Sequence, residues 1–89
     1  MKYCTLYLDD ITEKAALHAR LAGALMLPDH YGRNLDALKD CLTDVREDMT
    51  ITVKGYRELQ TALGGYAVSL GNVLRDTAEE NPHISVHLD

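Results

Sequence analysis

The sequence contains only two cysteines, Cys4 and Cys41. Two cysteines are too few for a disulfide framework, and neither has partners at the spacing of a zinc finger. We interpret both as reduced thiols that pack in the interior. No apolar run approaches the ~18 residues of a transmembrane helix. The first ten residues, MKYCTLYLDD, lack the apolar core and cleavage site of a signal peptide. We therefore expect a cytoplasmic protein that does not act at a membrane.

Basic residues are also scarce, and this limits the kind of partner. Nine Lys and Arg stand against 14 Asp and Glu, which gives a formal net charge of −5. Binding to the phosphates of a nucleic acid needs a basic surface, so the composition argues against a nucleic-acid partner. The acids are concentrated, because residues 29–48 hold six acids and three bases. This favours a basic protein partner, although a solvated helix face would give the same composition.

The length of 89 residues predicts one domain, residues 1–89, with a modest core. Segments 3–9, 50–54 and 83–88 are rich in strand-forming residues, and the last two alternate apolar and polar residues. In the first segment either the even-numbered or the odd-numbered residues could face the core, since Cys4, Leu6 and Leu8 oppose Tyr3, Thr5 and Tyr7.

Four helices are predicted between these strands. The first begins at Thr12, which can cap it, and stops at Leu27-Pro28. The second follows Asn34 as its cap, the third covers about 55–63, and the fourth covers about 66–80. Helical connections of this length predict parallel strands with right-handed crossovers. The expected fold is α/β, a three-stranded parallel sheet with about four helices packed mainly on one face.

The second helix carries a row of acids. At roughly 100° per residue, an arc of about 80° holds the carboxylates of Asp36, Asp40, Asp44 and Glu47. The apolar residues on the opposite side are Leu35, Leu38, Leu42 and Val45. The helix dipole stabilises Asp36 in the first turn, whereas Asp40 and Asp44 repel each other four residues apart. Helix stability therefore explains Asp36 better than Asp40, and the row is a candidate binding surface.

The loop ahead of this helix carries two ring side chains. Pro28 stiffens the approach, and Gly32 can adopt positive φ or admit another backbone closely. His30 and Tyr31 stand beside the helix start. Aromatic anchors next to charged groups are typical of protein interfaces. Packing against the helix is the alternative for Tyr31, and an ordinary loop position is the alternative for His30.

The segment LPDHYGRNLDALKDCLTD, residues 27–44, resembles the signature segment of the barstar family, the intracellular inhibitors of barnase-type ribonucleases. Four parts of this segment match the family's segment in one register without gaps: the proline, the Tyr-Gly pair, Asn-Leu-Asp-Ala-Leu and Asp-Cys-Leu-Thr. Length and element order extend the resemblance more weakly over the chain. It implies a barstar-like domain that fills the active-site cleft of an extracellular or toxin-type ribonuclease, with carboxylates in the places of RNA phosphates.

The resemblance also implies which residues contact the ribonuclease. Asp40 would be the central carboxylate and Asp36 its companion, while Asp76 matches an acidic interface position one methylene shorter than the family's glutamate. His30 replaces a family tyrosine and Lys39 a tryptophan, so the target need not be barnase. Val45 replaces a second tryptophan and Arg33 an acid. The full set of expected partner-binding residues is His30, Tyr31, Gly32, Asn34, Leu35, Asp36, Lys39, Asp40, Thr43, Asp44 and Asp76.

Two other kinds of function compete with this prediction. The first is an interaction module of the same fold whose basic partner is not a nuclease. The second is an enzyme with Cys41 as nucleophile, but the helical register places Cys41 beside the buried face, whereas a catalytic cysteine should be accessible and have a lowered pKa. His83 and His87 share a strand face, yet two ligands do not complete a metal site. We expect no catalytic residue, metal or cofactor.

Overall fold

A computed structural model describes the whole chain, residues 1–89. The elements follow the predicted order: β1 (Lys2–Tyr7), α1 (Lys14–Leu25), α2 (Leu35–Thr43), β2 (Met49–Lys54), α3 (Tyr56–Leu63), α4 (Gly65–Glu80) and β3 (Ile84–Leu88). None of the helices is long and apolar enough to cross a membrane.

The three strands form one parallel sheet in the order β1-β2-β3, as predicted. Cys4 pairs with Ile51, which pairs with Val86 on the third strand. The ambiguity in the first strand is resolved, because Cys4 and its even-numbered neighbours face the core while Tyr3 and Tyr7 remain 75% and 59% exposed. The core-facing residues of the first two strands are Cys4, Leu6, Met49, Ile51 and Val53.

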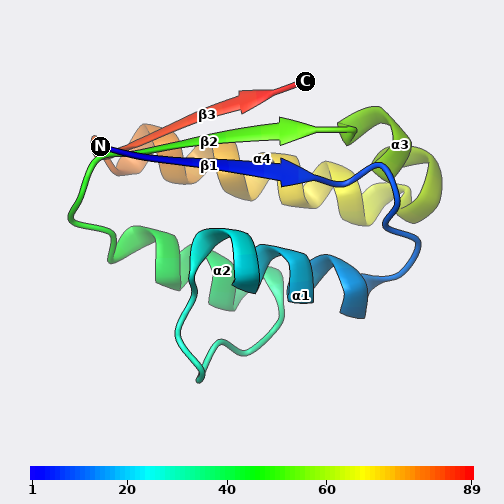
Figure 1. Ribbon diagram of the computed structural model, residues 1–89, viewed down its shortest axis with the longest axis horizontal. Helices are drawn as coiled ribbons and strands as arrows, with labels where there is room; N and C mark the ends of the chain where they lie inside the picture. The colour runs from blue at the N-terminus through cyan, green and yellow to red at the C-terminus, as the bar shows by residue number, and fades with distance from the viewer.

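Helices cover one face of this sheet. In Figure 1, α1 and α2 lie below the sheet and α3 lies beyond the end of β2. Leucines of α1, α2 and α4 are fully buried in one core with residues of the sheet, and burial of this apolar area is the main stabilising contribution to such a fold. These leucines are Leu17, Leu21, Leu38, Leu42, Leu70 and Leu74. The opposite face of the sheet carries exposed residues of β1 and β3, in line with the alternation in the sequence.

The two predicted helix caps have different outcomes. Asn34 caps α2, since its side chain accepts a hydrogen bond from the backbone N–H of Ala37 at 2.7 Å. The prediction for Thr12 is wrong. The first helix begins at Lys14, and Glu13 stands at the cap position without a side-chain hydrogen bond. Thr12 lies one residue before that position, too far out to reach the free N–H groups of the first turn.

Candidate protein-binding site

The acidic helix α2 is fixed to the core by one face. Leu38 and Leu42 are fully buried, whereas Asp36, Asp40 and Asp44 are exposed on the other side. The helix ends at Thr43, with Asp44 as its C-cap. The prediction that Glu47 continues the row on the helix is therefore wrong, because the chain has left the helix before Glu47. Three carboxylates, not four, make up the row.

The start of α2 is organised by its own side chains. Besides capping the helix, Asn34 donates from Nδ2 to the carbonyl of Gly32 at 3.4 Å. Gly32 does not take positive φ; the left-handed residue of the loop is Arg33, with φ 58°. A Cβ added at Gly32 would lie 3.3 Å from the Cβ of Ala37, a tight contact that requires this neighbour to move by a few tenths of an ångström. The close neighbour is thus a side chain of α2 rather than another backbone.

Tyr31 lies inside the molecule, with 7% of its surface exposed. Its hydroxyl lies 2.5 Å from Nδ1 of His18, and the Nε2 atom of the same imidazole lies 2.6 Å from the hydroxyl of Tyr66. Burial raises the pKa of Tyr31 to about 12 and lowers the pKa of His18. The loop is therefore tied to α1 and α4 through neutral side chains. Sequence reasoning missed His18, although it follows Leu17 in the apolar stripe of α1.

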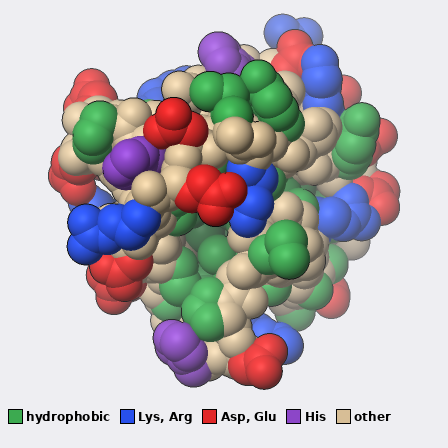
Figure 2. All heavy atoms as spheres, turned by 60° about the vertical axis from the view of Figure 1, so that its left-hand side comes forward, with side chains coloured by type: hydrophobic (Ala, Val, Ile, Leu, Met, Phe, Trp, Pro, Cys, Tyr) green, Lys and Arg blue, Asp and Glu red, His purple; other side chains and the backbone are tan.

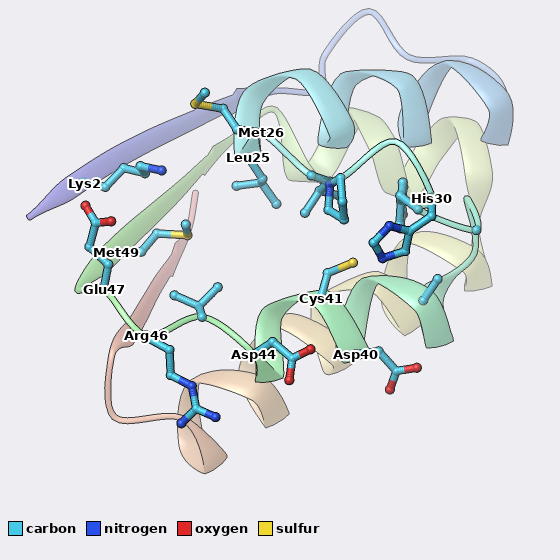
Figure 3. A pocket seen from close by; sticks show the side chains of 16 residues that line it. Lys2, Leu25, Met26, His30, Asp40, Cys41, Asp44, Arg46, Glu47 and Met49 are labelled. Carbon is cyan, nitrogen blue, oxygen red and sulfur yellow. The ribbon is translucent and has the colours of Figure 1, made fainter.

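A groove of about 680 Å³ runs between this loop and α2. Figure 2 shows it as a hollow with hydrophobic side chains on its floor and charged side chains around it. In Figure 3 the thiol of Cys41 points from α2 toward the loop that carries His30, while the side chains of Asp40 and Asp44 extend from α2 away from that loop. Its lining residues are Lys2, Leu25, Met26, Leu27, Pro28, His30, Tyr31, Gly32, Ala37, Asp40, Cys41, Asp44, Val45, Arg46, Glu47 and Met49.

The remaining predicted residues lie around this centre. Lys39 is half-buried, and its Nζ lies 3.6 Å from Oε1 of Glu80 at the end of α4. Thr43 is exposed and donates its hydroxyl to the carbonyl of Lys39 at 2.7 Å. Leu35 is half-buried against the core. Asp76 is exposed on α4, the helix that packs beside α2.

The family model described as "Barstar (barnase inhibitor)" matches residues 1–88. The chain belongs to the barstar family. It is 42% identical over 72 residues to the protein of Bacillus subtilis (strain 168) named "Putative ribonuclease inhibitor YrdF", an alignment that covers 80% of this chain and 79% of the relative. The three-stranded parallel sheet with four helices agrees with this membership.

In this barstar-family chain the two cysteines have different surroundings. Cys4 is buried in the sheet, as predicted, but Cys41 is only half-buried and borders the groove. Burial raises the pKa of the Cys41 thiol, and the negative charges of Asp40 and Asp44 raise it further. A raised pKa keeps the thiol protonated, which is the opposite of what a nucleophilic cysteine needs.

The histidines of this barstar-family chain are not gathered into a metal-binding cluster. No group of three or more His, Cys, Asp or Glu side chains is placed to hold a metal ion. His83 instead pairs through Nδ1 with a carboxylate oxygen of Asp48 at 2.9 Å. His87 is exposed on the third strand.

Proposed function

We propose that this protein is an inhibitor, acting as an immunity protein in the cytoplasm, of a barnase-type ribonuclease that is secreted or carried by a toxin. The family match and the name given to the Bacillus relative support a ribonuclease as the class of partner. Neither identifies the particular enzyme. The protein itself supplies no catalytic group in this proposal.

The observation that carries the proposal is the row of exposed carboxylates on a helix whose opposite face is fully buried. The active-site cleft of a ribonuclease presents positive charge that would hold RNA phosphates. Carboxylates in those places form charge-assisted hydrogen bonds with Arg and Lys without being cleaved. Asp40, at the middle of the row and at the edge of the groove, takes the central position, with Asp36 and Asp44 on either side.

The surface needs little ordering when it binds. The side chain of Asn34 fixes the start of α2, and the hydrogen bond between Tyr31 and His18 fixes the loop. Association loses less conformational entropy when the binding groups are already in place. Tyr31 and Asn34 therefore contribute mainly by holding the binding groups in position, while exposed His30 and Gly32 make the loop's direct contacts.

Residues at the edge of the surface adjust its charge. Lys39 opposes a basic partner, but its pairing with Glu80 offsets that charge. Asp76 extends the negative surface from α2 onto α4. Leu35 and Thr43 lie at the periphery of the contact. This distribution is expected to favour ribonucleases whose active-site cleft carries the complementary pattern of charge.

Titration of the protein into barnase and other ribonucleases of the same type, with RNA cleavage as the readout, tests the proposal. We expect one of these enzymes to lose activity in proportion to added protein until a one-to-one ratio is reached. An RNA-substrate analogue that occupies the cleft should compete with the inhibitor. Unchanged cleavage by every enzyme, together with recovery of a basic protein that is not a nuclease in a pull-down, would favour the interaction-module alternative instead.

A further inference from the structure

The groove beside α2 is apolar inside and open to solvent, and the row of carboxylates alone does not account for it. Eight of its 16 lining residues are hydrophobic. The end of α1 contributes Leu25 and Met26, the end of α2 contributes Cys41, and the start of β2 contributes Met49 (Figure 3). Met26, at the mouth of the groove, is 76% exposed, so its side chain is free to contact a partner.

The groove and the acidic row share two residues. Asp40 and Asp44 belong to the row and also line the groove. A partner whose basic groups meet these carboxylates therefore covers the mouth of the groove. An apolar pocket at the centre of an interface is where binding hot spots occur, because an anchoring side chain can be fully desolvated there.

Charge selects among possible occupants. Asp40, Asp44 and Glu47 line the groove, against the basic side chains of Lys2 and Arg46. Its carboxylates repel a nucleotide, and the overall charge of −5 opposes docking of a second copy of this chain. A side chain with an apolar body, carried beside basic residues, fits both the interior and the rim.

We propose that the groove receives one apolar or aromatic side chain from the ribonuclease, located at the rim of its basic cleft, and that this contact determines which ribonuclease is recognised. This inference rests on the proposed function. In addition to the electrostatic contact, the ribonuclease fills the groove with its anchoring side chain. An enzyme that lacks this side chain would bind more weakly. Val45, half-buried in the groove wall, leaves room for that side chain.

Val45→Trp tests this by filling the groove from within, and Val68→Trp is the matched control. Val68 is 46% exposed on α4 and does not line the groove. Against the ribonuclease found by titration, we expect Val45→Trp to raise the dissociation constant by about tenfold or more. Val68→Trp should change it by less than about twofold. Circular dichroism and urea unfolding would confirm that both variants fold.

Methyl NMR of the unmodified protein provides a second readout that does not depend on a variant folding. The chain has three methionines, of which Met26 and Met49 line the groove and Met1 does not. With ¹³C-methyl methionine and unlabelled ribonuclease, the Met26 and Met49 signals should shift and show cross-peaks to aliphatic or aromatic protons of the enzyme. Met1 should show none.

The outcomes separate the two proposals. The groove inference would be overturned if inhibition depends on Asp40 but Val45→Trp binds as tightly as the unmodified protein and the Met26 and Met49 signals do not move. The inhibitor function would remain intact in that case. No inhibition of any ribonuclease would overturn both. The inference would be supported if Val45→Trp binds the ribonuclease more weakly. If that variant does not fold, cross-peaks from Met26 and Met49 to the enzyme would support it instead.

Discussion

The hydroxyl of Tyr31 lies 2.5 Å from Nδ1 of His18, so a residue of the binding loop is held by a residue of the first helix. The other nitrogen of the imidazole lies 2.6 Å from the hydroxyl of Tyr66 on α4. A neutral imidazole offers one donor and one acceptor, which matches two hydroxyl partners. One buried side chain thus joins two helices and the loop that precedes the acidic row.

We expect the free energy of unfolding to decrease as pH falls below about 6.5, the ordinary pKa of histidine. Burial lowers the pKa of His18 in the folded protein, so the unfolded chain takes up the proton first. The stabilisation is present above the unfolded pKa and is lost as pH falls through the folded pKa.

Urea unfolding at several pH values between 7.5 and 5 measures this dependence. His18→Gln should flatten it, whereas His30→Gln, in an exposed part of the loop, should not. Stability that stays constant or rises between pH 7 and pH 5 in the unmodified protein would show that His18 does not act in this way.

Association with the ribonuclease should slow as salt is added. Exposed carboxylates attract a basic cleft over a distance that shrinks from ~10 Å at 0.1 M to ~3 Å at 1 M ionic strength. Stopped-flow mixing at increasing salt measures the association rate constant, and the dissociation rate constant should change less. Asp36→Asn should reduce the salt dependence. A rate independent of salt would mean that the acidic row is not the contact surface.

Cys41 should react slowly with iodoacetamide. Its raised pKa leaves little thiolate near neutral pH, so we expect alkylation slower than that of glutathione. Asp40→Asn removes one of the charges that raise the pKa and should speed the reaction. Mass spectrometry resolves Cys41 from Cys4, whose burial should protect it. Fast, selective alkylation of Cys41 in the folded protein would reopen the enzyme alternative.

Features fixed by neighbouring residues could be predicted from the sequence. The cap at Asn34 and the burial of Leu38 and Leu42 depend on local spacing, and both are confirmed. Leu35 is only half-buried, and Val45 lies beyond the end of the helix. Glu47 was misplaced because a helical projection does not show where the helix ends. The groove could not be predicted, because Lys2 and Met49 start strands that are distant from the loop in sequence. His18 was missed because its two hydroxyl partners come together only in the folded chain.

The carboxylate of Asp40 is central to the proposed inhibition. Asp40→Asn keeps the shape of the side chain and removes its charge, and Glu58→Gln is a matched control on α3, at the other end of the molecule (Figure 1). The decisive measurement is inhibition of RNA cleavage by the two variants, alongside their free energies of unfolding. We predict that Asp40→Asn loses about 2–5 kcal/mol of binding free energy while its stability changes by less than about 0.5 kcal/mol, and that Glu58→Gln inhibits like the unmodified protein. Full inhibition by Asp40→Asn would contradict the account.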